Sequence, residues 1–359
     1  MNKLKTLRRS KLAKTLFYFS VFIFSFITIL LSSNQIISQR IIPENINIVS
    51  DKLEYFSKNK DKFDVIFLGS SQTYRHIIPS EFDEFMKAEG YNLKSFNFGL
   101  TGLKFPEAQF YLQKILAMQP KNLKWLFLEY LEGLDVNPQN LSTAREIYWH
   151  TPQNFLTVSQ LIWESDRSLE KKIQLTYQNW VPSTYNFLSS GKGSQSIQSI
   201  LNPDRKHQKN LSSLGKQKDG YLSLDDETGK GFSERNLNFK KNLKRYKKRV
   251  NNYKRYVNKS NPKPLTPHAK SLISEMIQSA KKQDIETIFL MSPGLVPRDI
   301  TKSAYRAGQI QTLFNLDDPN RYPSLYQPEK RFDTEHLNRE GAKEFTQFLA
   351  REFSSYLKE

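Results

Sequence analysis

A pair of serines follows an apolar run early in the chain, and an aspartate and a histidine stand close together near its end. Residues 63–71 read "FDVIFLGSS", so Ser70 and Ser71 come directly after a glycine that permits a tight turn. Residues 332–345 read "FDTEHLNREGAKEF", which places Asp333 three residues before His336. A hydroxyl, an imidazole and a carboxylate are a nucleophile, its base and the group that orients the base. The two stretches together predict nucleophilic acyl chemistry.

Each of these residues also has a purely structural interpretation. Gly-Ser-Ser after a strand is often a turn or a helix cap, and a lone histidine is often an ordinary polar residue. Arg75 and His76 are candidates for substrate binding or for capping. The five histidines show no metal-ligand spacing, and "GKGSQS" lacks the glycine-lysine order of a phosphate loop. We therefore expect no metal, no nucleotide and no other cofactor.

The elements that must position these residues follow an α/β rhythm. Short apolar runs predict four buried strands and a weaker fifth, at 63–69, 94–99, 123–130, 286–293 and 310–316. The intervening segments predict helices, one capped by Ser80 and ending at Gly90, and a last one that begins at Asn338. Strands that alternate with helices indicate a mainly parallel sheet covered on both faces. Reactive groups gather where such strands end, which is where Ser71 would lie.

The N-terminus predicts a membrane anchor. Six basic residues within 1–14 precede the uncharged apolar segment 15–33, which is long enough for one spanning helix. A cleaved signal peptide and a buried core helix are the alternatives. The basic flank would keep the N-terminus in the cytoplasm and place the rest of the chain outside. Residues 34–62 are polar and predict a stalk, and the absence of cysteine excludes disulfides and thiolate chemistry.

The formal net charge of +18 is concentrated in two places, the N-terminal tail and residues 202–261. The latter hold 17 Lys and Arg against 6 Asp and Glu. They belong to a predicted insertion, 147–265, that divides the domain into 63–146 and 266–359. Within it, an apolar stripe at helical spacing runs along a basic helix: Phe239, Leu243, Tyr246, Val250, Tyr253 and Val257. Two interpretations stay open, an arm that grips an anionic polymer and a helix packed with its basic side in water.

Three motifs resemble the SGNH (GDSL-like) hydrolase superfamily, in particular its membrane-anchored extracytoplasmic branch that acylates envelope polymers. They are "FLGSS", "NFGLTG" at 97–102 and the Asp-x-x-His-Leu-Asn-x-x-Gly-Ala pattern. The resemblance covers 63–130 and 286–359 and implies a three-layer α/β/α, flavodoxin-like domain. It also implies that Ser71 is the nucleophile, His336 the base and Asp333 its partner, with the backbone amides of Ser71 and Gly102 as the oxyanion hole.

The chain departs from this family at one motif. The family places an oxyanion-hole asparagine in Gly-x-Asn-Asp after the third strand, whereas this sequence reads "FLEYLEGLDVNPQN" at 127–140. Asn97 and Asn137 are candidate substitutes, and a site lined by Glu129 is another alternative. The loss of one oxyanion donor typically costs about 10²- to 10³-fold in rate. Slow transfer to a bound acceptor and a role without turnover are both compatible with this departure.

Together these features predict a single-pass protein of the plasma (inner) membrane with an extracytoplasmic esterase or O-acyltransferase domain. Its expected substrate is an envelope polysaccharide or acylated glycan, with acetyl as the acyl group. The resemblance implies a polytopic membrane acyltransferase as partner, and an extracytoplasmic domain is not expected to meet nucleic acid. The alternatives are a non-catalytic module that binds or assembles an anionic envelope polymer, and an esterase for lipids or small esters.

Overall fold

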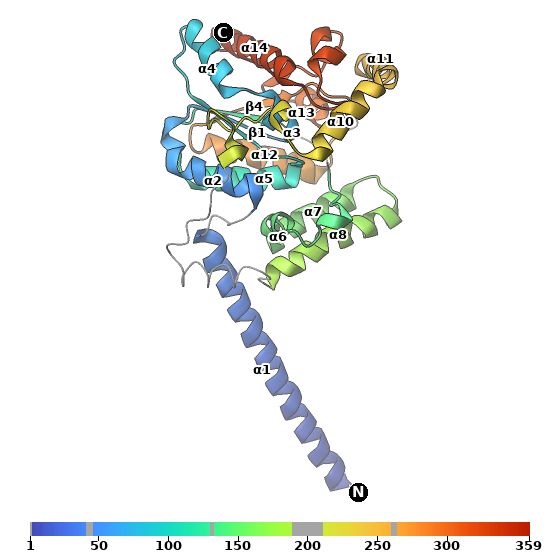
Figure 1. The fold of residues 1–359 in the computed structure, drawn as a ribbon. Coiled ribbons are helices and arrows are strands. Elements are labelled where there is room, and N and C mark those ends of the chain that lie inside the picture. The colour runs from blue at the N-terminus through green and yellow to red at the C-terminus, as the bar shows by residue number, and fades with distance from the viewer. Residues whose placement is uncertain (1, 41–45, 130–132, 189–210, 260–263) are drawn as a thin grey trace.

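The computed structural model describes residues 2–40, 46–129, 133–188, 211–259 and 264–359, and its centre is one parallel sheet (Figure 1). The strands lie in the order β2-β1-β3-β4-β5, which is the flavodoxin-like order. Their bounds confirm the predicted strands: β1 (Val65–Gly69), β2 (Ser95–Gly99), β3 (Trp125–Glu129), β4 (Glu286–Met291) and β5 (Leu313–Asn315). All neighbouring strands are parallel, so their carboxyl ends meet at one edge.

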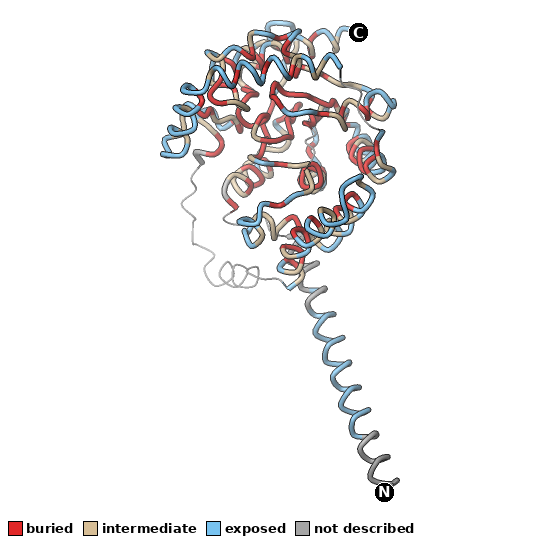
Figure 2. Tube along the Cα trace, turned by 90° about the vertical axis from the view of Figure 1, so that its right-hand side faces the viewer, coloured by how far each residue is buried: buried red, intermediate tan, exposed pale blue. Residues whose placement is uncertain are grey.

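Helices cover both faces of the sheet and enclose two apolar cores (Figures 1 and 2). On one face pack α2 (Asn47–Asn59), α5 (Phe105–Ala117) and α12 (Pro267–Lys281). On the other face pack α4 (Pro79–Ala88) and α14 (Arg339–Tyr356). The short helices α3 (Ser71–His76) and α13 (Asp299–Arg306) follow β1 and β4. Side chains alternate between the two cores along β1, where Ile66 faces one and Phe67 the other.

The first helix, α1 (Asn2–Arg40), projects from the domain (Figure 1). Within it, residues Lys11–Ile29 are long and apolar enough to cross a membrane, and none of them is buried against the domain. By length and composition a signal sequence would pass the same test. The structure thus has one N-terminal helix suited to a membrane, as the sequence predicted.

The expected stalk forms part of the domain from residue 46 onward. Helix α2 buries Val49, Leu53 and Phe56 in the first core. Its Lys52 is fully buried, and the ammonium donates to the carbonyl oxygens of Asn97, Gly99 and Gly220 at 2.8, 2.7 and 2.7 Å. Burial lowers the pKa of Lys52 well below its ordinary value. The helix is therefore fixed to the outer strand of the sheet.

The insertion after β3 forms two separate parts. Its first part contains α6 (Ala144–Trp149), α7 (Pro152–Glu164) and α8 (Leu169–Phe187), with Trp149, Val158, Ile162 and Leu175 in a small core. The second contains α10 (Lys230–Lys241) and α11 (Leu243–Lys259), which pack on the second core of the domain. Between them the segment 211–229, expected as a loop, includes two short 3₁₀ turns, Leu211–Leu214 and Leu224–Asp226.

This segment covers the outer edge of β2. The amide of Asn97 donates to the carbonyl of Asp219 at 2.9 Å, and the Tyr74 hydroxyl donates to that of Ser213 at 2.7 Å. A Cβ at Gly220 would lie 2.1 Å from the Asn97 carbonyl oxygen, so the close approach requires glycine there. This packing was not predictable from the sequence, because the segment is mainly polar.

Two predicted helix starts have different outcomes. Helix α4 begins at Pro79 with Ile78 as its N-cap, so Ser80 is not the cap. The reason is that proline suits the first helical turn, where its missing N–H costs nothing. The start of α14 is confirmed, because Asn338 accepts a hydrogen bond from the amide of Gly341 at 2.9 Å.

Candidate active site

The structure brings Ser71, His336 and Asp333 together at the carboxyl edge of the sheet. The Ser71 hydroxyl lies 2.9 Å from Nε2 of His336. Nδ1 of the same ring lies 3.1 Å from both carboxylate oxygens of Asp333. An ionised carboxylate only accepts hydrogen bonds, so Nδ1 must carry a proton, and Nε2 of the neutral ring is then free to accept from Ser71. The predicted contact between serine and histidine is confirmed, 265 residues apart in the chain.

The surroundings of Asp333 keep its carboxylate ionised. Backbone amides of Glu335 and His336 donate to it at 2.7 and 2.8 Å, and Arg235 from α10 lies 2.5 Å away. Burial alone would raise the pKa of Asp333, but the contacts with His336 and Arg235 outweigh it and hold the pKa well below its ordinary value. An ionised Asp333 can orient the imidazole and stabilise it when it takes up a proton.

The backbone of Ser71 is positioned by the contacts of the residues on either side of it. Ser70 is the N-cap of α3 and accepts from the amide of Gln72 at 3.0 Å. Glu129, the last residue of β3, accepts from the amide and hydroxyl of Ser70 and from those of Thr73, at distances from 2.7 to 3.3 Å. A Cβ at Gly69 would lie 2.0 Å from the Thr73 hydroxyl, so only glycine permits this turn.

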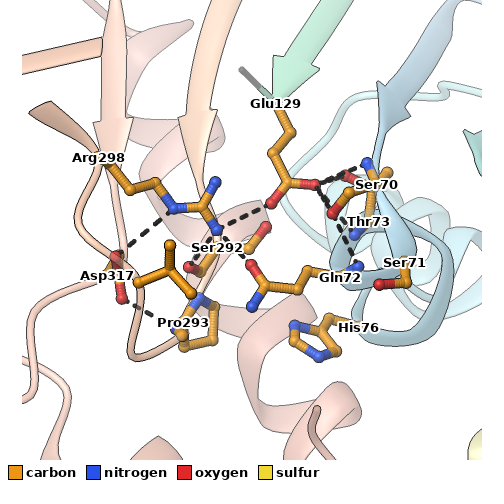
Figure 3. Close-up of polar contacts among 12 residues, drawn as sticks. Ser70, Ser71, Gln72, Thr73, His76, Glu129, Ser292, Pro293, Arg298 and Asp317 are labelled. Atoms are coloured by element: carbon orange, nitrogen blue, oxygen red, sulfur yellow. Dashed lines mark hydrogen bonds and ion pairs between the residues drawn. The ribbon is translucent and has the colours of Figure 1, made fainter. Parts of the chain in front are cut away.

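Beneath this turn lies a buried ion network that joins the carboxyl ends of β1, β3, β4 and β5 (Figure 3). Arg298, after β4, lies 3.1 Å from Glu129 and 3.6 Å from Asp317, after β5. It also donates to the side-chain oxygen of Gln72, the residue next to Ser71. Burial alone would raise the pKa of Glu129, but Arg298 and the donors of α3 outweigh it and lower the pKa. Burial raises the pKa of Asp317.

One backbone amide at this turn remains available for an oxyanion. The amides of Ser70, Gln72 and Thr73 all donate to side chains, as described above, whereas that of Ser71 has no acceptor within the described residues. A free N–H at the nucleophile is one of the donors an acyl-transfer site needs. The oxyanion role of the Ser71 amide stays a prediction, and its free N–H supports it.

Asn97, suggested above as an oxyanion donor, instead caps α3, and the suggestion is corrected. Both of its amide hydrogens are used, in bonds of 2.7 Å to the carbonyls of Thr73 and Ile77 at the end of α3, and its side-chain oxygen accepts from the Gly99 amide. Asn137 accepts from the amide of Gln139 and lines a cavity of about 200 Å³ together with Gly102. Neither Ser71 nor His336 lines that cavity, and the oxyanion role of Gly102 stays a prediction.

A pocket of about 450 Å³ opens beside His336 and Asp333. Its other wall is the basic face of α10 and α11, which contributes Arg235, Arg245 and Arg249. Arg249 pairs with Glu335 at 2.8 Å. The three arginines of the lining outnumber its two carboxylates, Asp333 and Glu335, so the pocket is positively charged. The apolar stripe of these helices packs inward, with Phe239, Tyr246, Val250 and Tyr253 buried. The interpretation of a packed helix with a basic outer side is thus confirmed, although the helix is divided at Asn242.

Arg75 and His76 are buried and have structural contacts. Arg75 pairs with Glu227 at 2.6 Å. His76 accepts from the amide of Leu337 at 3.0 Å, and its ring lies 5.9 Å from that of His336. Burial lowers the pKa of His76 well below its ordinary value, with the nearby His336 and Arg331 adding to the effect. In the described part of the chain no group of three or more His, Asp or Glu residues is arranged to hold a metal ion.

Sequence reasoning missed Arg235, Arg298 and Gln72. Arg235 is one basic residue among many, and nothing in "SPGLVPRD" marks Arg298 as the partner of a glutamate 169 residues earlier. No protein-family model matches the chain, and no curated protein matches it in sequence.

Proposed function

We propose that the chain is an SGNH-like serine esterase or O-acyltransferase, anchored in the plasma (inner) membrane with its domain on the extracytoplasmic side. The observation that carries this proposal is the continuous contact from Asp333 through His336 to Ser71. Its position supports the proposal further, because ligands of doubly wound sheets bind at the carboxyl edge between the strands where the order reverses. Here those strands are β1, which leads to Ser71, and β3, which ends at Glu129.

The arrangement supports a two-step acyl transfer. The Ser71 hydroxyl attacks the ester carbonyl as its proton passes to Nε2 of His336, and Asp333 stabilises the resulting imidazolium. The leaving alcohol then takes the proton from His336, and the acyl group remains on Ser71. Water or a sugar hydroxyl attacks this ester and gives its proton to His336, which returns it to the Ser71 oxygen as the acyl group departs. With water the outcome is hydrolysis, and with a sugar hydroxyl it is transfer.

The charge of the N-terminus supports the proposed side of the membrane and, with it, the proposed substrate. The six basic residues before the apolar part of α1 favour a cytoplasmic N-terminus. The domain would then face the cell envelope, where an acetylated polysaccharide is the proposed substrate and a polytopic membrane acyltransferase the proposed acyl donor.

Release of p-nitrophenol from p-nitrophenyl acetate by the full chain in detergent tests the enzymatic part of the proposal. The wild type should release it above the uncatalysed rate, and Ser71→Ala should return the rate to background because the nucleophile is lost. Ser80→Ala, which alters a serine on the next helix, is the matched control and should retain the wild-type rate. Equal rates in the wild type and Ser71→Ala would contradict an esterase.

The second candidate is a non-catalytic module that holds an anionic envelope polymer. The observation that favours it is the pocket beside His336, with three arginines in its wall. A folded wild type that releases no p-nitrophenol, yet binds an acidic polysaccharide in a salt-dependent way, would support this candidate over the enzyme.

A further inference from the structure

Helix α8 buries mainly polar side chains and exposes apolar ones, the reverse of an ordinary surface helix. Its buried side chains are mostly polar, namely Gln178, Asn179, Ser183 and Asn186, with Leu175 and Pro182 among them. Two of these polar residues bond to the domain: Asn179 donates to the carbonyl of Leu134 at 2.8 Å and Asn186 to that of Ile147 at 2.6 Å. A helix whose outer face is in water normally buries its apolar side.

An apolar stripe runs along the outer face of α8, which also exposes Glu170 and Gln174. Leu169, Ile173, Tyr177 and Trp180 follow one another at intervals of four, four and three residues, so they form a stripe within an arc of about 80°. Their exposed fractions are 63, 56, 58 and 51%. The neighbouring helix α7 adds Leu156 and Trp163, seven residues apart and also exposed. We name these six residues the hairpin face.

This concentration of exposed apolar side chains is specific to one place. Outside α1, eleven large apolar residues are exposed in the described chain, and eight of them lie between residues 156 and 188. Single exposed apolar residues are normal on a protein surface, but a contiguous group signals a contact surface.

The position of the hairpin face indicates what covers it. Helix α8 contacts α1, and α6, α7 and α8 lie on the side of the domain from which α1 projects (Figure 1). Tryptophan and tyrosine, which make up half of the face, prefer the boundary between lipid and water. Arg167, Lys171 and Lys172 lie at this end of α8 together with Glu164, Asp166 and Glu170, so the charges balance and the apolar side chains carry the argument.

We propose that the hairpin face lies in the interface of the membrane that α1 spans, so that the domain is held against the bilayer at two places. Such helices bury their apolar side about 5–10 Å into the boundary between headgroups and acyl chains. The proposal concerns only α1, α7 and α8 and does not depend on the chemistry of Ser71.

Site-directed fluorescence tests this, because the chain contains no cysteine that would have to be removed. Tyr177→Cys and Ile173→Cys place a label on the hairpin face. Gln174→Cys is the matched control on α8 away from the stripe, and Gln347→Cys is the control on α14, across the domain from α1. Each full-length variant is labelled with an environment-sensitive fluorophore and reconstituted in vesicles of phosphatidylcholine and phosphatidylglycerol. Thermal melts confirm that each variant is folded.

Brominated lipid should quench most of the emission of the labels at 173 and 177 and little of that at 347, with 174 between them. Aqueous iodide should show the reverse order. Labels at 173 and 177 that iodide quenches as strongly as the label at 347 would overturn the proposal and leave a partner protein as the occupant. Labels shielded from both quenchers would also overturn it, because protein and not lipid would then cover the face.

Discussion

At the scale of single residues, the carboxylate of Glu129 lies beneath the α3 turn and contacts the residues on both sides of Ser71. One of its oxygens collects four donors from Ser70 and Thr73, and the other faces Arg298. Both partners of this ion pair are almost completely shielded from water, with side-chain exposures of 0 and 1%. Since Arg298 cannot reach solvent, the negative charge of Glu129 is needed to balance its positive charge.

Glu129→Gln should lower the free energy of unfolding by about 3–5 kcal/mol, because the buried Arg298 would lose the nearer of its two charge partners and keep only Asp317. Urea unfolding at neutral pH measures the loss. The matched control is Glu81→Gln, which removes a partly exposed pair with Lys343 and should cost less than about 1 kcal/mol. Similar losses in the two variants would show that the buried network does not stabilise the turn that carries Ser71.

His76 should make stability depend on pH. The pKa of His76 in the folded chain lies well below the ordinary value. Below about pH 6.5, His76 therefore binds a proton in the unfolded chain but stays neutral in the folded chain. The free energy of unfolding then falls as the pH falls, by up to about 1.4 kcal/mol per pH unit from this group. His76→Gln keeps an acceptor for the Leu337 amide and removes the titration. Urea unfolding between pH 7 and pH 5.5 should show a smaller decrease in the variant, and equal decreases would refute this role.

At the scale of elements, the helices α10 and α11 connect the insertion to the candidate site. Their buried tyrosines donate to the domain, Tyr246 to the carbonyl of Tyr326 and Tyr253 to Asp317, at 2.9 and 2.6 Å. Their basic side chains form one wall of the pocket beside His336. The same two helices therefore have an inner role in packing and an outer role in setting the charge of the pocket.

Arg245→Gln should weaken binding of a negatively charged acetyl ester by about 2- to 5-fold, which corresponds to about 0.5–1 kcal/mol for a partly exposed pair. The expected change is a higher KM for 4-acetoxybenzoate with little change in kcat, and no change for the uncharged 4-acetoxybenzamide. Added salt should reduce the difference. Lys247→Gln is the matched control, because Lys247 is exposed on α11 and does not line the pocket. Equal effects of both variants would indicate a general surface charge instead of a subsite.

At the scale of the whole molecule, the sequence was sufficient for the sheet and for the meeting of Ser71 with His336. Buried parallel strands leave continuous apolar runs, and their common edge brings distant loops together. The ion network was not predictable, because nothing local marks Glu129 and Arg298 as partners. Asn97 was misassigned because its type suits an oxyanion donor, whereas its place on β2 makes it a cap for α3.

The hydrophobic pattern also failed to predict the packing of α2 and the orientation of α8. The three buried apolar residues of α2 are separated by charged ones, so residues 47–59 resembled a stalk. In α8 the apolar stripe is visible in the sequence, but periodicity does not tell which side of a helix faces the core. The structure shows that the polar side does.

The central claim is that Ser71 is a nucleophile activated by His336 and Asp333, and the rate of labelling by a fluorophosphonate tests it most directly. Peptide mass spectrometry should locate the adduct on Ser71, and Ser71→Ala should remain unlabelled. His336→Gln and Asp333→Asn should slow labelling by about 10²- to 10⁴-fold, because the serine would lose its base or the base its orientation. His268→Gln, a histidine far along the chain from the site, should label at the wild-type rate. A folded wild type that forms no adduct on Ser71, or that labels equally fast without His336, would contradict the account.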